Sequence, residues 1–86
     1  MASYRIEVPA TAEKQIRKLG KADQLRVLRA VQTLAADPYP AGARRLHGYE
    51  DVFRIRVGTF RILYSVAARV LVVIVLKVGH RKDLYR

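Results

Sequence analysis

Apolar and polar residues alternate from Val52 to Tyr64, and the pattern is interrupted once, at Gly58-Thr59. A period of two is typical of β-strands, and two such runs separated by two residues predict a β-hairpin. A glycine at the first loop position suits a turn that requires a positive φ there. The alternation predicts three facing apolar pairs on one side of the hairpin: Val57 with Phe60, Ile55 with Ile62, and Phe53 with Tyr64.

The other side of the same hairpin is predicted to carry arginine. Arg56 falls opposite Arg61, and Arg54 lies two residues away along the first strand. Like charges directly across a sheet repel and destabilise the pairing. Three guanidinium groups on one face therefore favour a bound anion. An ordinary solvated face accounts for the pattern equally well, because salt screens the repulsion between exposed charges.

A short strand and a helix are predicted before this hairpin. Residues 3–8 alternate, and Pro9 ends the strand. Thr11 is the candidate N-cap of the first helix, and Gly20 ends that helix as a C-cap. The buried positions of this helix recur at helical spacing: Ala12, Ile16 and Leu19.

A second helix is predicted over residues 22–36, where Asp37-Pro38 ends it. Its buried stripe consists of four residues at helical spacing, with Ala35 beside them: Leu25, Leu28, Val31 and Leu34. Both stripes are too narrow to stabilise isolated helices, so we expect a helical hairpin packed on one face of the sheet.

The rest of the chain completes the sheet. Residues 38–51 contain prolines and glycines and predict an irregular segment, and Ala67-Ala68 mark a second turn. Residues 70–78 are apolar apart from Lys77, which is typical of a central strand covered on both faces. Residues 1–86 are therefore predicted to form one small α+β domain. It is a strand, two helices and a three-strand meander, with a four-stranded, mainly antiparallel sheet packed on a helical hairpin.

Charge and composition narrow the function. The 86 residues include 17 Lys and Arg but only seven Asp and Glu, giving a formal charge of +10. So basic a small domain predicts a polyanionic partner: nucleic acid first, an acidic protein second, an anionic membrane third. The sequence has no cysteine, and its two histidines lack metal-ligand spacing, so we expect neither thiolate chemistry nor a metal or other cofactor. The apolar run 71–78 is too short to span a membrane, and we expect a cytoplasmic protein without a membrane partner.

Two blocks of sequence, taken together, resemble one family. They are Phe-Arg-Ile-Arg-Val-Gly-Thr-Phe-Arg-Ile-Leu-Tyr at 53–64 and Leu-Lys-Val-Gly-His-Arg-Lys-Asp-Leu-Tyr-Arg at 76–86. The chain resembles the RelE-type toxins of toxin–antitoxin pairs, within the RelE/ParE superfamily. The resemblance implies a ribosome-dependent endoribonuclease that cuts messenger RNA in the ribosomal A site, together with an acidic, RelB-like antitoxin. ParE-like toxins share the fold, inhibit DNA gyrase and lack the nuclease residues, and they are the alternative.

The resemblance also implies which residues are catalytic. The basic positions before the turn are matched by Arg54 and Arg56, and the position after it by Arg61. The arginine after the last strand is matched by Arg81, and the C-terminal tyrosine by Tyr85. Relatives often have lysine before the turn, whereas this chain has arginine and a shorter turn.

The chemistry of RNA cleavage fits these residue types. Without a metal, the 2′-hydroxyl attacks the adjacent phosphorus, and negative charge builds on the phosphate oxygens. Guanidinium groups bind such oxygens in a fixed fork, so we expect the arginines to stabilise charge and hold the substrate. Arginine is a poor proton donor because its pKa exceeds about 12, although Arg81 is a candidate for protonating the leaving oxygen, as the resemblance implies.

The base is predicted to be Tyr85. Only about one free tyrosine in a thousand is ionised at neutral pH, but neighbouring arginines favour the phenolate. Two alternatives stay open. Tyr85 could instead pack with Leu84 against the sheet, and His80 is a rival base because histidine titrates near neutrality.

Other basic residues are predicted to contact RNA. The loop residues Arg44 and Arg45 would touch a phosphate backbone, although plain solvated surface explains them too. The remaining candidates for RNA contact lie on the last strand and the tail: Lys77, His80 and Lys82.

Overall fold

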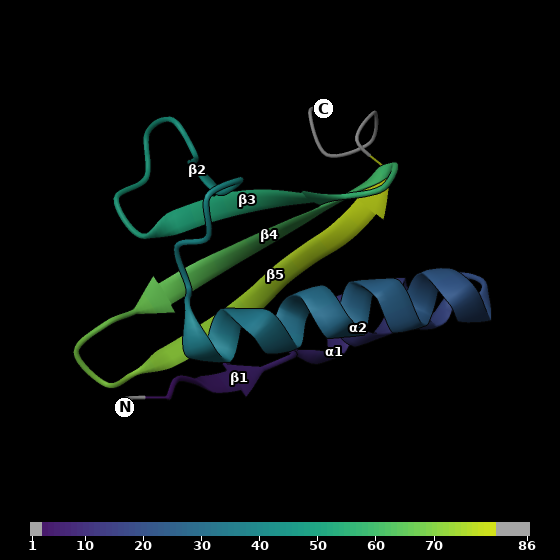
Figure 1. The fold of residues 1–86 in the computed structure, drawn as a ribbon, viewed down its shortest axis with the longest axis horizontal. Helices are drawn as coiled ribbons and strands as arrows, with labels where there is room; N and C mark the ends of the chain where they lie inside the picture. The colour runs from purple at the N-terminus through teal and green to yellow at the C-terminus, as the bar shows by residue number, and fades with distance from the viewer. Residues whose placement is uncertain (1–2, 81–86) are drawn as a thin grey trace.

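Two helices cover one face of a β-sheet in the computed structural model, which describes residues 3–80 (Figure 1). In chain order the elements are β1 (Arg5–Glu7), α1 (Ala10–Arg17), α2 (Lys21–Ala36), β2 (Arg44–Arg45), β3 (Val52–Val57), β4 (Phe60–Ala67) and β5 (Val72–His80). The predicted α+β class, the helical hairpin and the three-strand meander are confirmed.

The sheet of this described part has five strands rather than the four predicted, in the order β1-β5-β4-β3-β2. β1 runs parallel to β5, and all other neighbours are antiparallel. The additional strand, β2, lies inside the segment predicted to be irregular and consists of Arg44 and Arg45. Two residues cannot display a period of two, so the sequence pattern holds no signal for it.

The central hairpin has the predicted register. Val57 pairs with Phe60, Ile55 with Ile62, Phe53 with Tyr64, and Arg56 with Arg61. Gly58 has a φ of 60°, as its place in the turn requires. The side chain of Arg26 on α2 reaches this turn, because a Cβ added at Gly58 would lie 3.1 Å from its Nη1 atom.

The predicted caps of α1 were wrong. The N-cap is Pro9, and Thr11 lies inside the helix. Gly20 is the N-cap of α2 rather than the C-cap of α1. The end of α1 is stabilised differently: the Nε2 atom of Gln24 donates to the carbonyl oxygen of Arg17, the last helical residue, at 3.2 Å, and to that of Leu19, just beyond the helix, at 2.8 Å.

The buried stripe of α2 was only half correct. Val31 and Leu34 are buried as predicted, but Leu25 is 57% and Leu28 39% exposed. Val27 is buried instead. Positions 27, 31 and 34 also recur at helical spacing, so periodicity allowed either stripe. The packing of α2 against the sheet selects between them.

The core lies between the helices and the sheet, and its most buried members come from both layers: Val27, Leu34, Ile62, Tyr64, Val73 and Val75. Tyr64, on the predicted apolar side of the hairpin, packs there. Its hydroxyl donates to the carbonyl oxygen of Pro38 at 2.8 Å. Burial, with the nearby charge of Asp37, raises the pKa of Tyr64 from 10.0 to about 12.

β5 begins two residues later than predicted and is covered less completely. Val70 and Leu71 lie in the preceding turn, and Leu76 is 38% exposed, so coverage on both faces was wrong there. By alternation with buried Val73 and Val75, Leu76 lies on the face of the sheet that the two helices leave uncovered. The register is irregular beside it, because Leu63 faces Lys77 but Tyr64 faces Val75. This makes Leu76 the extra residue of a β-bulge.

None of the helices in the described residues is long and apolar enough to cross a membrane. The longest, α2, has 16 residues, whereas a spanning helix needs about 20.

Candidate nucleic-acid interface

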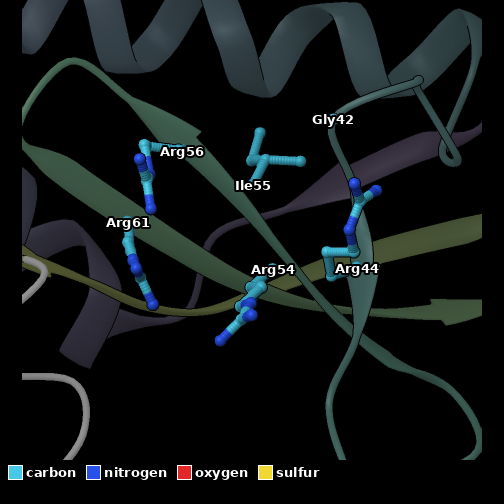
Figure 2. Close-up of a pocket in the computed structure, with 6 residues that line it drawn as sticks. All are labelled: Gly42, Arg44, Arg54, Ile55, Arg56 and Arg61. Carbon is cyan, nitrogen blue, oxygen red and sulfur yellow. The ribbon is translucent and has the colours of Figure 1, made fainter.

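Four arginines surround one cavity of about 320 Å³ on the side of the sheet that faces away from α1 and α2 (Figure 2). We call this the open side. Its lining residues are Gly42, Arg44, Arg54, Ile55, Arg56 and Arg61. We call it the arginine cavity. Arg54 and Arg56 alternate along β3 with buried Phe53, Ile55 and Val57, so their side chains point away from the helices.

Strand register brings these arginines together in two cross-strand pairs. Arg56 lies opposite Arg61 on β4, as predicted, and Arg54 lies opposite Arg44 on β2. Figure 2 shows the side chains of Arg56 and Arg61 next to each other. Directly opposed like charges disfavour the sheet, so the same arrangement that weakens the fold concentrates positive charge around one space.

Arg61 differs from its cross-strand partner in exposure. It is 9% exposed, whereas Arg56 is exposed. Among the described residues, Arg61 is the only charged side chain that is buried. A buried guanidinium interacts more strongly with a nearby anion than an exposed one, because less water screens it. Arg61 is therefore the member of the cavity best placed to bind a phosphate oxygen strongly.

Arg44 is held by its own loop. Its Nη1 atom donates to the carbonyl oxygens of Ala43 at 3.1 Å and Ala41 at 3.3 Å. The guanidinium group thus loses rotamer freedom before any ligand binds, which lowers the entropy cost of binding.

The segment that carries Arg44 is anchored at several points. The Tyr64 hydroxyl binds the carbonyl of Pro38, and the amide of Tyr39 donates to Oδ1 of Asp37 at 3.0 Å. The amide of Ala43 donates to the carbonyl of Pro40 at 2.9 Å. These contacts fix the path from α2 to β2, which brings Gly42 and Arg44 to the arginine cavity.

Three other predicted RNA-contact residues lie elsewhere. The guanidinium carbon of Arg45 is 5.5 Å from the ring centroid of Phe53. Arg45 therefore lies on the opposite side of the two-stranded β2–β3 ribbon from Arg44. Lys77 and His80 line a different cavity, beside α1. The His80 ring lies 4.7 Å from the ring of Phe60, so it faces the helix side of the sheet rather than the arginine cavity. Arg81, Lys82 and Tyr85 lie outside the described residues.

The chemistry of the arginine cavity is that of an anion site. Guanidinium groups donate hydrogen bonds and accept none, so the arginines of the cavity can bind a phosphate but cannot act as a base. Among the described residues, no cluster of three or more His, Asp or Glu side chains could hold a metal ion.

Sequence reasoning missed two features of the cavity. Gly42 was assigned no role, and its sequence neighbourhood carries no signal of one. The facing of Arg44 and Arg54 was missed as well, since it depends on β2. The adjacent arginines Arg44 and Arg45 marked a basic loop, but only the structure separates them onto opposite sides.

Comparisons with known proteins agree with this fold. A family model described as the ParE toxin of type II toxin–antitoxin systems, parDE, matches residues 6–85. The toxin RelG of Mycobacterium tuberculosis is 31% identical over 88 residues, which cover 96% of this chain and 97% of RelG.

Solved toxin–antitoxin complexes have the same fold. The RelBE2 complex of M. tuberculosis contains a chain 27% identical to this one, with a TM-score of 0.83, covering 96% of this chain and 97% of that chain. A chain of the archaeal RelE–RelB complex from Pyrococcus horikoshii is 29% identical, also with a TM-score of 0.83, covering 94% and 98%.

Proposed function

Since this chain belongs to the RelE/ParE family of toxins from type II toxin–antitoxin systems, we propose that it is a ribosome-dependent endoribonuclease that cuts messenger RNA in the ribosomal A site. The observation that carries the proposal is the arginine cavity, where four guanidinium groups, one of them buried, face one space of about 320 Å³. An enzyme of this kind acts in the cytoplasm, where translation takes place.

In this proposal the 2′-hydroxyl of one nucleotide attacks the adjacent phosphorus, and the bond to the 5′-oxygen of the next nucleotide breaks. The products are a 2′,3′-cyclic phosphate and a free 5′-hydroxyl, and the reaction needs no metal. Arg56 and Arg61 stabilise the charge that develops on the phosphate oxygens. Arg44 and Arg54 hold the flanking backbone, which positions the scissile bond.

The proton transfers are assigned by resemblance to the family. Tyr85 removes the proton from the 2′-hydroxyl, and Arg81 gives one to the leaving oxygen. Both lie outside the described residues. The contact of His80 with Phe60 on the other side of the sheet supports Tyr85 over His80 as the base.

The proposed partner is an acidic, RelB-like antitoxin. Solved structures of relatives are toxin–antitoxin complexes, which supports such a partner. The charge of +10 supports it independently, because complementary potentials favour association with an acidic protein.

The test is cleavage of a short message on purified ribosomes, with the cut mapped by primer extension. Arg56→Ala should slow cleavage about 10²–10³-fold, the loss typical for one preorganised donor to a developing oxyanion. Arg69→Ala is the matched control, because it removes the same charge from the exposed turn between β4 and β5. Cleavage by Arg56→Ala at the wild-type rate would contradict the proposal.

The alternative function is that of a ParE-like inhibitor of DNA gyrase, and the match of residues 6–85 to a ParE toxin family model supports it. Induced expression separates the two. The nuclease produces cut messages and loss of translation, whereas a gyrase inhibitor produces double-strand DNA breaks while messages stay intact.

A further inference from the structure

A second cavity, of about 340 Å³, adjoins the β2–β3 ribbon. Two of its residues, Arg45 on β2 and Phe53 on β3, lie opposite each other. Arg45 directly follows Arg44 and Phe53 directly precedes Arg54, and both of those arginines line the arginine cavity. Successive residues of a strand point to opposite sides, so the two cavities share the ribbon as a wall. We call the second one the aromatic cavity, and its lining residues are Tyr39, Arg45, Glu50, Asp51, Phe53 and Val66.

Flat groups form one wall of the aromatic cavity. The ring of Tyr39 meets that of buried Phe53 edge to face at 5.1 Å, and the Arg45 guanidinium lies 5.5 Å from the same ring. Phe53 in turn stacks on Tyr64 at 5.9 Å. Tyr39 is 49% exposed, so its ring offers open surface on a fixed support. Aromatic rings and guanidinium planes are the groups on which proteins stack RNA bases.

The rim supplies hydrogen-bond acceptors. Glu50 and Asp51 line the cavity, and they are two of only seven acidic residues in the sequence. A carboxylate accepts hydrogen bonds and donates none. Guanine presents two adjacent N–H donors on its Watson–Crick edge, at N1 and N2, whereas uracil presents one donor between two acceptors. Carboxylates beside a stacking surface therefore favour guanine most and uracil least.

We propose that the aromatic cavity binds a guanine base of RNA. The base stacks on Tyr39 and Arg45 and donates from N1 and N2 to Glu50 or Asp51. The volume lies at the lower end of the range for small-ligand pockets, about 300–1,000 Å³, which suits a single base. The inference deepens the proposed function and rests on it, since it assigns base recognition to a surface beside the phosphate site.

A cationic side chain of a protein partner is the main competing ligand, because aromatic rings and carboxylates also bind cations. The charge of Arg45 disfavours binding of such a cation. Its guanidinium already lies against Phe53 and lines the cavity, so a second cation would enter beside a like charge.

The position of the two cavities suggests the path of the RNA. In the described residues, β2 is one of the two edge strands of the sheet. One nucleotide can therefore place its phosphate in the arginine cavity while the chain crosses the edge and puts a neighbouring base in the aromatic cavity.

The experiment is an NMR titration of the ¹⁵N-labelled full chain with 5′-GMP, 5′-AMP, 5′-CMP and 5′-UMP. The amide signals of Tyr39 and Phe53 should reach half-saturation at a GMP concentration at least about fivefold lower than for UMP, the lower end of discrimination by a good base contact. The amides of Arg56 and Arg61 should respond to all four nucleotides alike, because each carries a phosphate. That second response tests the proposed function separately.

Two variants test whether Glu50 and Asp51 produce the preference for GMP over UMP. Glu50→Ala/Asp51→Ala should bring the GMP-to-UMP ratio at Tyr39 to about one. Tyr49→Leu is the matched control, because Tyr49 is 58% exposed and lies outside the cavity lining; it should leave the ratio unchanged.

Three results would overturn the inference: equal affinity for GMP and UMP in the wild type, a GMP preference that survives Glu50→Ala/Asp51→Ala, or saturation of Tyr39 by acetyl-Gly-Arg-Gly-amide rather than by nucleotides. If GMP shifts the amide signal of Tyr39 while the amide signals of Arg56 and Arg61 respond to no nucleotide, the proposed function fails and the base site stands.

Discussion

The two sides of the β-sheet are built from the same alternating strands but carry opposite chemistry. On the side covered by α1 and α2, Ile62, Tyr64 and Val75 are fully buried. On the open side, Arg56 faces Arg61 and Arg54 faces Arg44, around a single cavity. One hairpin therefore contributes to the core and to the candidate site at once.

Stability and function are separated between the two sides of the sheet within one small domain. Burial of an aliphatic or aromatic side chain contributes about 1.5–3 kcal/mol, so the covered side stabilises the fold. Like charges paired directly across the strands on the open side repel each other and disfavour folding. The covered side has to offset that cost, and 86 residues provide only a small core to do so.

The largest expected effect on stability is on the covered side. Leu34→Ala removes a side chain with no exposed surface, and we expect it to lower the free energy of unfolding by about 3 kcal/mol, through lost burial and the cavity left behind. Urea denaturation followed by circular dichroism measures this. Leu25→Ala, at a residue of the same type that is 57% exposed on the same helix, should cost less than about 1 kcal/mol. Equal losses would remove the distinction between the sides.

A smaller effect is expected at the hydroxyl of Tyr64, which ties the covered side to the segment that carries Arg44. Tyr64→Phe leaves the buried carbonyl of Pro38 without its 2.8 Å donor and should cost about 1–2 kcal/mol at neutral pH. The same variant tests pH dependence. The pKa of Tyr64 is about 12 in the folded protein and 10.0 ordinarily, so the folded state holds its proton more tightly.

The sign of the pH effect follows from that difference. The unfolded chain loses the Tyr64 proton first as pH rises, so the free energy of unfolding should fall between about pH 10 and 12. Tyr64→Phe should fall less steeply than the wild type over this window, because lysines and other tyrosines titrate in both. Parallel curves for the two proteins would contradict the burial of this phenol.

The smallest effect on stability is expected on the open side. Arg56→Ala should leave the free energy of unfolding unchanged or raise it by up to about 0.5 kcal/mol, because it removes the repulsion with Arg61. Ribosome binding should respond in the opposite way: affinity drops, and the slope of log affinity against log salt becomes shallower by about one, as for one lost phosphate contact. A clear loss of stability would assign Arg56 to the fold rather than to binding.

The prediction from sequence was most accurate where a pattern repeats within a few residues. Six residues of alternation determine which way Arg56 and Arg61 point, and Gly58 marks the turn, so the register followed from local sequence alone. The predicted gathering of Arg54, Arg56 and Arg61 followed from the same alternation.

The prediction failed where more than one local pattern was possible. Two sets of positions along α2 have helical spacing: one is 25, 28, 31 and 34, and the other is 27, 31 and 34. Packing against the sheet buries the second set. At Gly20, a cap for either helix suited the residue, but in the structure it is the N-cap of α2, and its carbonyl oxygen accepts from the backbone amide of Gln24 at 2.8 Å. Such choices depend on packing between segments, which periodicity does not contain.

The sequence by itself thus determined the hairpin, the class of fold and the excess of positive charge, because these depend on neighbouring residues and on composition. Only the tertiary structure placed Arg44 opposite Arg54, turned Arg45 onto Phe53 and put His80 on the helix side. Those positions depend on a two-residue strand and on contacts between segments far apart in the chain. The free energy that selects them arises from burial and hydrogen bonds that exist only once the chain has folded.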